Sequence, residues 1–524
     1  MANNEPTETT ALLADSQPPE PSLETETLLG NVRSGTSKTR KKELPQPFAA
    51  LGSPASIEVE IDNGEGLYIT QSLSSLQNSS KTPVHLRTSN LASLMHLLKG
   101  NIGTGVLAMP SACKYAGLWA GPVGVLVIGF IATHCMHMLV NCSRKLCKRR
   151  EGLYALGYAE ILEESLRTGP PRLQRFHRHG RYTINGFLLL TQFGFCCVYI
   201  LFIAQNIQQV VNSFHSNGPD VKVYLLVSAA LLIPYCFVKN LKHLAPFSTF
   251  ANLLVIVGLV IVFQELVQGL PDVSTRPAIL PVDKLPLYFG TAMFAFEAIG
   301  LVMPIENKMR HPEDFGGCAG ILNLGMTFVV CLYTAMGFYG YLKYGDQAEG
   351  SITLNLPGKN WLFTTVNLMY AMAIFISYGL QFYVVVRIIW PALEAKISSR
   401  KAKIVSEYIF RTALVLGTCG ISMVVPHLDL MISLVGSLAS SSLALMFPPL
   451  IEIITYSAEG ERLSAIKVFK NVLIILLGIV GFATGTFAAL NEIIRTFQDP
   501  SGGDVGRNAT MVAGWDISHS TTYS

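Results

Sequence analysis

One short segment, Leu98 to Gly105, combines residue types that suit ligand binding through the backbone. It carries three glycines, an asparagine and a threonine inside a hydrophobic stretch long enough to cross a membrane. These residues form helices poorly, so the segment predicts an interrupted helix. In hydrocarbon, unwound backbone persists only where it lines a cavity or is covered by protein. Close helix packing through small residues is the alternative explanation. The candidate ligand-binding positions are Gly100, Asn101, Ile102, Gly103, Thr104 and Gly105.

Two ionisable residues accompany this segment. His96 precedes Gly100 by one helical turn, so both lie on the same face of the expected helix. Histidine titrates near neutral pH, which suits His96 to accept and release a proton. A structural histidine that joins two helices by hydrogen bonds is the alternative. Lys99 is either a counter-ion near the interruption or a side chain that extends to the membrane surface.

A carboxylate lies near the middle of a second apolar segment, at Glu297. An isolated ionised carboxylate is costly there, so Glu297 is expected to be protonated or paired with His96 or Lys99. A buried carboxyl group is a natural proton carrier, since burial favours its protonated form. The flanking Phe294 and Phe296 either form a wall of a binding pocket or pack in the core.

The composition places these residues in a membrane protein composed of helices. Hydrophobic residues make up 50% of the chain and charged residues 14%, against about 25% in soluble proteins. The net charge of +4 does not indicate nucleic-acid binding, because the basic residues cluster in loops between apolar stretches. A span needs about 20 apolar residues, which predicts about eleven spans. They lie near residues 91–118, 120–141, 184–212, 221–238, 244–268, 285–306, 317–342, 363–389, 405–424, 429–456 and 467–491.

The spacing of the unusual segments predicts an internal repeat. The interrupted first span and the carboxylate-bearing sixth span are five spans apart, as in transporters built from two inverted repeats. Because five is an odd number, the second block of five spans begins on the opposite side of the membrane and is inverted relative to the first. The expected architecture is therefore two inverted blocks of five helices plus one extra helix, with spans one and six discontinuous.

The basic loops predict the orientation. Arginine and lysine are concentrated between spans two and three, from Arg144 to Arg181, and are sparse on the opposite face. By the positive-inside rule the N-terminus is cytoplasmic and the C-terminus lumenal or extracellular. Asn508, in a sequon of the predicted C-terminal tail (residues 493–524), is then a glycosylation candidate. The sequons at Asn78 and Asn141 fall on the cytoplasmic side and should remain unmodified.

Residues 1–88 form a polar N-terminal tail that we expect to be disordered, ahead of a transmembrane domain over residues 89–492. Two segments of this tail resemble the acidic dileucine signals that cytosolic adaptors recognise for endosomal and lysosomal sorting. Their key positions are Glu8, Leu12, Leu13, Glu24, Leu28 and Leu29.

Other chemistries find no support in the sequence. None of the ten cysteines lies in an outward loop, and no Cys-x-x-Cys pair has zinc-site spacing, so we expect neither a lumenal disulfide nor a metal site. The glycine-rich segment lacks the Gly-Lys-Ser/Thr of a phosphate-binding loop. The serine cluster at residues 440–442 has no suitable histidine and aspartate and fits helix packing better. We therefore predict that the chain is not an enzyme.

Four segments together resemble the proton-coupled amino acid transporters of solute carrier family 36. The resemblance extends from about residue 88 to residue 492, and the four segments are Met95–Gly105, Phe289–Glu297, Pro304–Asn307 and Gly350–Pro357. It implies a fold similar to that of the leucine transporter. It also implies symport of protons with small neutral amino acids at the plasma membrane or out of lysosomes. Protons would be the coupling ion, with no cofactor.

The resemblance assigns roles to individual positions. The family's proton-linked histidine matches His96, the unwound motif matches Gly100–Gly105, and the span-six motif matches Phe294–Gly300. One departure is the lack of outward-loop cysteines, which removes any disulfide of the kind found in related animal transporters. Some family members are thought to act as nutrient sensors, so signalling proteins are possible partners of the N-terminal tail. Two alternatives stay open: a sodium-coupled amino acid transporter of the same fold, and a low-turnover amino acid sensor.

Overall fold

The computed structural model describes residues 87–498 except 151, 152, 154, 216, 217, 240, 297, 318, 359 and 458–462. Within these residues, nine helical segments are long and apolar enough to cross a membrane. The sixteen-residue α9 and the interrupted first segment bring the spans to the predicted eleven. In chain order the spans are α2 (Asn90–Asn101) with α3 (Thr104–Leu107) and α4 (Met109–Ala116), α5 (Ala120–Arg149), α8 (His177–Phe214), α9 (Val221–Cys236), α10 (Leu241–Leu266), α11 (Leu285–Ala295) with α12 (Ile299–Glu306), α13 (Ile321–Tyr344), α14 (Trp361–Glu394), α15 (Arg400–Val424), α16 (Leu428–Val435) through α17 (Phe447–Ser457), and α18 (Ala465–Gln498).

Spans one and six are discontinuous, as the sequence predicts. Helix α2 ends at Asn101, and the backbone of Ile102 is extended, with φ −83° and ψ 93°. Helix α3 then begins at Thr104 and continues into α4 after a single turn residue, Ala108. Span six is interrupted between α11 and α12. Both interruptions are flanked by buried residues, which satisfies the requirement that unwound backbone be covered by protein.

Spans one to five and spans six to ten make equivalent helix–helix contacts. Four of the first five spans contact the span five positions later: α4 contacts α11, α5 contacts α13, α8 contacts α14, and α9 contacts α15. The cross contacts match as well. Helix α10 packs on α14 as α16 packs on α8, and α4 packs on α13 as α12 packs on α5. Two inverted blocks of five helices plus α18 account for this pattern, which confirms the predicted fold class.

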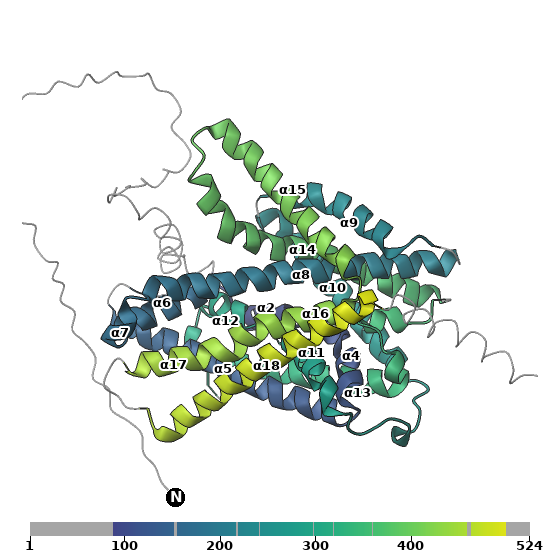
Figure 1. The fold of residues 1–524 in the computed structure, drawn as a ribbon, viewed down its shortest axis with the longest axis horizontal. Coiled ribbons are helices and arrows are strands. Elements are labelled where there is room, and N and C mark those ends of the chain that lie inside the picture. Colours follow the sequence, from purple (N-terminus) through teal and green to yellow (C-terminus); the bar gives the residue numbers. More distant parts are fainter. Residues whose placement is uncertain are drawn as a thin grey trace, which may run out of the picture. The chain divides into compact units, whose positions relative to one another are not determined.

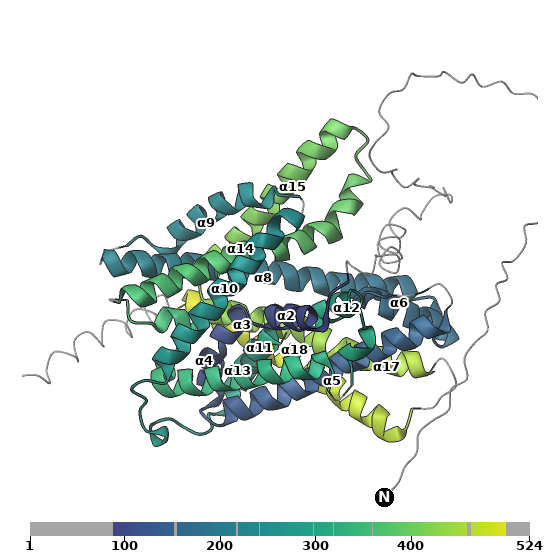
Figure 2. The ribbon, with the colours of Figure 1, turned by 180° about the vertical axis from the view of Figure 1, so that it is seen from behind.

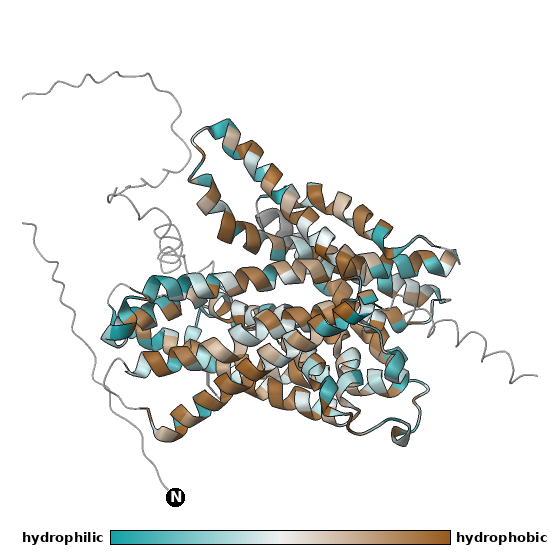
Figure 3. Cartoon of the chain, viewed as in Figure 1, coloured by the Kyte–Doolittle hydropathy of each residue, from teal (hydrophilic) through white to brown (hydrophobic). Residues whose placement is uncertain are grey.

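The helices form two groups (Figures 1 and 2). Helices α8, α9, α14 and α15 lie together, and the two discontinuous spans lie in the other group with α5, α13 and α16–α18. Hydrophobic residues run along the spans and hydrophilic residues gather at their ends (Figure 3). Large apolar side chains such as Phe130, Leu253 and Phe487 are exposed on the outer faces of α5, α10 and α18. Membrane lipid would cover such surfaces.

One end of the bundle carries most of the basic residues, and we call it the basic end. Helix α5 continues two turns beyond the predicted boundary, to Arg149, because hydropathy detects only the part of a helix in hydrocarbon. The segment predicted as a loop after span two contains α6 (Tyr158–Thr168) and α7 (Pro171–Gln174). Helix α6 is amphipathic and buries Ile161 and Leu162 against α8 and α17. A short amphipathic helix of this kind does not stand out in a membrane hydropathy profile.

Span ten changes its helical repeat near the middle. Residues Gly436–Ser440 and Ser442–Met446 are π-helical, between α16 and α17. A Cβ atom on Gly436 would lie 1.9 Å from the carbonyl oxygen of Gly290, so span ten packs tightly on α11. The Ser437 hydroxyl donates to the Ser433 carbonyl at 2.8 Å, and Ser441 bonds back in the same way. These buried serines therefore serve helix packing, as the sequence suggests.

Candidate functional site

The two interrupted spans touch where their helices break. A Cβ atom on Gly105 would lie 2.8 Å from Cα and 3.0 Å from Cβ of Ala295, the last residue of α11. Real Cβ atoms do not approach backbone atoms so closely, so only glycine fits at position 105. This contact holds the two unwound segments next to each other.

A single tyrosine of span seven bridges the two segments. The Tyr333 hydroxyl oxygen lies 2.5 Å from the Asn101 carbonyl oxygen and 2.9 Å from the Ala295 carbonyl oxygen. Tyr333 is fully buried, and its ring packs on Phe296 with the centroids 5.1 Å apart. The hydrogen of this hydroxyl is therefore shared between two carbonyl oxygens, one from each interruption.

Spans three and eight border the other side of the first interruption. A Cβ atom on Gly103 would lie 4.0 Å from the Tyr199 hydroxyl oxygen. The Gln381 amide nitrogen lies 3.5 Å from the same hydroxyl, which is a long and weak hydrogen bond. Phe195 packs edge-on against Phe294, with their centroids 4.7 Å apart. The predicted pocket residue Phe294 thus faces span three.

Polar backbone and side-chain groups remain available at the first interruption. The Asn101 amide nitrogen donates to the Leu97 carbonyl at 2.9 Å, while its Oδ1 is buried without a hydrogen-bond partner among the described residues. Gly103 precedes α3 and offers no capping side chain. The first N–H groups of a helix have no acceptor within it and carry partial positive charge. An acceptor and several donors therefore lie within a few residues of one another.

The predicted proton-linked histidine lies away from this contact. His96 is exposed on α2, with Lys99 and Lys308 as its charged neighbours, and it makes no hydrogen bond to a described residue. Lys99 reaches the Ser248 carbonyl at 3.4 Å. Gly100, one turn after His96, faces Leu301 of α12, where an added Cβ would lie 2.6 Å from Cδ1.

Several predicted positions lie outside the described residues. Glu297 is among them, so its pairing with His96 or Lys99 stays a prediction. Asn508 and the sorting positions of the N-terminal tail lie outside as well: Glu8, Leu12, Leu13, Glu24, Leu28 and Leu29. Among the described residues, no group of three or more histidine, cysteine, aspartate or glutamate side chains could hold a metal ion.

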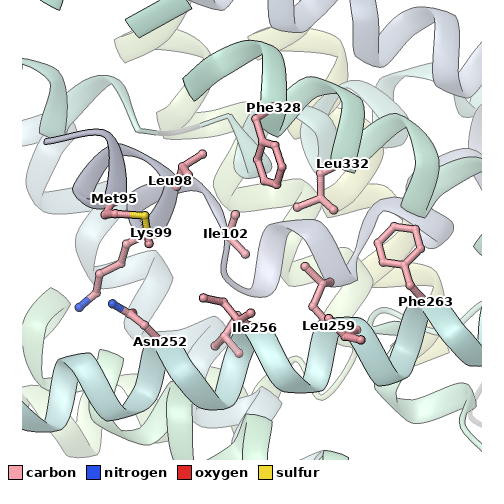
Figure 4. Close-up of a pocket in the computed structure, with 12 residues that line it drawn as sticks. Met95, Leu98, Lys99, Ile102, Asn252, Ile256, Leu259, Phe263, Phe328 and Leu332 are labelled. Atoms are coloured by element: carbon pink, nitrogen blue, oxygen red, sulfur yellow. The ribbon is translucent and has the colours of Figure 1, made fainter. Parts of the chain in front are cut away.

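A cavity of about 510 Å³ adjoins the first interruption, between α2, α10 and α13 (Figure 4). Ile102, the extended residue after α2, lies on its wall. Lys99 and Asn252 supply the polar groups, and Figure 4 shows their nitrogen atoms pointing toward each other at one end. The other lining residues are apolar: Met95, Leu98, Val255, Ile256, Leu259, Val260, Phe263, Phe328 and Leu332.

The end of the bundle opposite the basic end is closed by side-chain contacts. The Tyr115 hydroxyl donates to the Asp429 carboxylate at 2.7 Å and joins α4 to the start of α16. The segment of residues 348–356 covers this junction. Lys114 donates to the Ala348 carbonyl at 3.1 Å, and Gln209 of α8 donates to the Leu354 carbonyl at 2.9 Å. Spans one, three and ten are thereby tied together at this end.

The basic end is held by a second network. Arg144 donates to the Glu306 carboxylate at 2.7 Å, and the Glu306 side chain is 5% exposed. Thr88 forms a parallel β-bridge with Met309: its N–H donates to the Lys308 carbonyl at 2.9 Å, and its carbonyl accepts from the Arg310 N–H at 2.9 Å. The approach to span one is therefore fixed to the segment that follows span six.

Two further sets of polar residues were not predicted from the sequence. The first set is Tyr333, Tyr199 and Gln381. Nothing in the sequence around them predicts a role in the site, because an isolated polar residue in a span does not indicate which residues it contacts. The second set was detectable, since ionisable residues within spans are rare. In it, Lys470 of α18 lies 2.6 Å from the His134 ring of α5, and Asn471 donates to Glu452 of α17 at 2.6 Å.

Comparison with known proteins identifies the family of this chain. The profile of the family described as "Transmembrane amino acid transporter protein" matches residues 87–491. The proton-coupled amino acid transporter-like protein pathetic of Drosophila melanogaster is 36% identical over 412 residues, which cover 79% of this chain and 87% of the relative. The probable amino acid transporter skat-1 of Caenorhabditis elegans is 27% identical, over 78% of this chain and 90% of its own length. A solved structure of Mhp1 in an inward-facing conformation aligns over 80% of this chain and 93% of its own, with 12% identity and a TM-score of 0.40.

Proposed function

The chain belongs to the transmembrane amino acid transporter family, and from that premise we propose that it is a proton-coupled symporter of small neutral amino acids. The observation that supports this proposal is the contact between the two interrupted spans, next to the buried, unpartnered Asn101 Oδ1 and the uncapped start of α3. Paired donors and acceptors of this kind match the two ends of an amino acid zwitterion.

The substrate would bind through its charged ends. Its carboxylate would accept from the N–H groups at the start of α3, after Gly103, where the helix dipole favours negative charge. Its ammonium group would donate to Asn101 Oδ1 and to carbonyl groups of the two interruptions. Small size follows from the aromatic neighbours, because Phe195 packs against both Phe294 and Tyr199, and the Tyr199 hydroxyl lies near Gly103.

Proton coupling is proposed through His96 or Glu297. The Drosophila relative is named as proton-coupled transporter-like, and His96 lies on the exposed face of α2. The basic end would face the cytosol by the positive-inside rule. Protonation from an acidic lumen or exterior would favour closure of the site on substrate, followed by release into the cytosol by alternating access.

The membrane would be the plasma membrane, the lysosomal membrane or both. The two dileucine-like segments of the N-terminal tail support delivery to late endosomes and lysosomes through sorting adaptors. A role in nutrient signalling would use the same tail as the contact for signalling proteins. A sodium-coupled transporter and a low-turnover sensor are the competing functions.

One flux experiment separates these functions. The purified protein in liposomes is given a proton gradient, a sodium gradient or neither, with glycine, alanine, proline and tryptophan as substrates. The proposal expects uptake of the small amino acids that follows the proton gradient and ignores sodium. Uptake that follows sodium and ignores pH would identify the sodium-coupled alternative. Amino acid binding without measurable flux in any gradient would identify the sensor.

A further inference from the structure

The cavity beside the first interruption is apolar along most of its length and open at its surface. Its volume of about 510 Å³ is in the range of sites that hold a small organic molecule. Several of its lining residues are exposed, so it is not an enclosed void: Met95, Ile256, Val260 and Phe328. Between lining residues along α10, Leu253 and Val257 are exposed and apolar as well. Membrane lipid would therefore surround the mouth of the cavity, and an amphiphile dissolved in the bilayer could enter it.

The polar end of the cavity presents hydrogen-bond donors and a positive charge. The nitrogen atoms of Lys99 and Asn252 point toward each other there (Figure 4). The Lys99 ammonium group has a 3.4 Å contact with the Ser248 carbonyl and, among the described residues, no ion pair with a carboxylate. A charged side chain within a membrane span is costly unless it is paired. An anionic acceptor between the two nitrogen atoms would satisfy both of them.

The length and depth of the cavity restrict the anion that could bind. Asn252 and Phe263 are eleven residues apart on α10, about 16 Å, which is roughly the extended length of a twelve-carbon alkyl chain. Asn252 also lies five residues, about 7 Å, inside the apolar span that begins at Phe247. The phosphate of a phospholipid stays at the membrane surface, and a sterol has no charge to pair with Lys99. A fatty acid has one chain and a small carboxylate, so it matches both ends of the cavity.

We propose that this cavity binds a free fatty acid from the bilayer, with its carboxylate between Lys99 and Asn252 and its chain directed along α10 toward Phe263. The bound molecule would contact α2 on one side and α10 and α13 on the other, and would brace the first half of span one against them. Alternating access requires parts of the bundle to move against each other. Bound fatty acid should therefore slow uptake. This effect rests on the proposed symport function, whereas the binding itself does not.

The binding test uses the purified full-length chain in phosphatidylcholine nanodiscs at neutral pH, with a myristate analogue that carries a photoreactive group near the end of its chain. Peptide mass spectrometry should find the cross-link on α10 or α13. Ile256→Trp, which fills the cavity, should abolish this labelling. Leu253→Trp is the matched control, because Leu253 lies on the same helix, is exposed and does not line the cavity.

A competition experiment tests recognition of the carboxylate. Unlabelled myristate should displace the analogue at a concentration about tenfold lower than tetradecanol, which has the same chain and no charge. In Lys99→Met, which keeps the side-chain length and removes the charge, this preference for myristate should disappear. Phosphatidylserine and cholesterol, added to the nanodiscs, should not displace the analogue.

The uptake test compares wild type with Asn252→Leu in liposomes that have an imposed proton gradient. Asn252→Leu removes one hydrogen bond to the carboxylate, so half-inhibition of uptake should need about tenfold more myristate than in wild type. Fatty acids also carry protons across bilayers, and that loss of the gradient would lower uptake equally in both proteins. The difference between the two proteins therefore isolates the effect of the bound molecule.

Each arm has a result that would overturn the inference. Labelling that survives in Ile256→Trp would place the bound chain elsewhere, and equal competition by myristate and tetradecanol in wild type would exclude recognition of the carboxylate. Displacement by phosphatidylserine or cholesterol in place of myristate would identify a different lipid. Equal inhibition of wild type and Asn252→Leu would remove the effect on uptake. The proposed function fails separately, when wild type without added fatty acid shows no uptake driven by a proton gradient, and the labelling results do not depend on that outcome.

Discussion

Gly105 shows how a single residue sets the distance between the two interrupted spans. We expect Gly105→Ala to push α3 away from Ala295, because the added Cβ would lie 2.8 Å from a backbone atom. Overpacking of this kind costs about 1–3 kcal/mol. The variant should unfold at a lower temperature and lose most of its uptake.

The matched control is Gly420→Ala in α15, where an added Cβ meets no atom within 4 Å. In a helix interior this change should be neutral or stabilise by up to about 1 kcal/mol. Equal melting temperatures for the two alanine variants would show that the contact between Gly105 and Ala295 is not tight in solution.

His96 is the residue that we expect to link pH to uptake. An imidazole can take up a proton between pH 5 and 8, whereas the methyl group of alanine cannot. His96→Ala should therefore abolish acid stimulation of uptake in liposomes, while His215→Ala, which alters an exposed histidine just after α8, should not. Unchanged pH dependence in His96→Ala would assign coupling elsewhere, with Glu297 as the next candidate.

Only some residues of the candidate site could be predicted from the sequence. Glycine, asparagine and threonine at residues 100–105 mark the first interruption because helix propensity is a local property. Tyr333 was not predictable, because its role depends on two carbonyl groups, at positions 101 and 295, that come together only in the folded chain. The exposure of His96 likewise depends on neighbours that are distant in sequence.

At the scale of elements, closure opposite the basic end depends on the contact between α4 and α16. A hydrogen bond to a charged group contributes about 1.5–3 kcal/mol, and loss of about 1.4 kcal/mol changes an equilibrium tenfold. We therefore expect Tyr115→Phe or Asp429→Asn to increase opening at this end about tenfold.

Cys113 is a native reporter for this opening, since it is fully buried two residues before Tyr115. In purified protein, its labelling by a polar thiol reagent, followed by mass spectrometry of the Cys113 peptide, should accelerate in both variants. The same measurement on Cys331, which is exposed on α13, provides the control and should not change. Equal Cys113 labelling in wild type and variants would show that this contact does not control closure.

The elements themselves were largely predictable, because a membrane span requires a long apolar run. The predicted span boundaries agree with the observed helix ends within a few residues where the chain leaves the membrane at a proline or glycine, as at Pro426. The predicted boundary is wrong where a helix continues into water, as α5 does to Arg149. Helix α6 was missed because its stability comes from packing on α8 and α17, which the local sequence does not indicate.

At the scale of the whole molecule, eleven spans place the two ends of the transmembrane domain on opposite sides of the membrane. From the proposed orientation, with the basic end in the cytosol, we expect Asn508 to be lumenal or extracellular and to carry a glycan. Asn508→Gln should therefore remove the mobility shift that a glycosidase produces in wild-type protein from mammalian cells. Asn78→Gln is the control, and a shift that disappears with this variant would reverse the proposed orientation.

The inverted repeat was predictable only in outline. The positions of the two unusual spans, five apart, suggested it, and the similarity between the halves is too weak to prove it from sequence. The matching contacts of α10 with α14 and of α16 with α8 establish the relation in three dimensions. Side-chain identity can diverge between the repeats while the packing of helix axes is retained.

The β-bridge at Thr88 has a mechanical consequence. Thr88 lies two residues before α2, and Lys308 lies two residues after α12, so the bridge connects the ends of two half-helices. A force applied to the backbone at Thr88 is shared between them through the two hydrogen bonds, rather than acting on α2 alone. Tension on the chain that enters span one would therefore load both discontinuous spans at once.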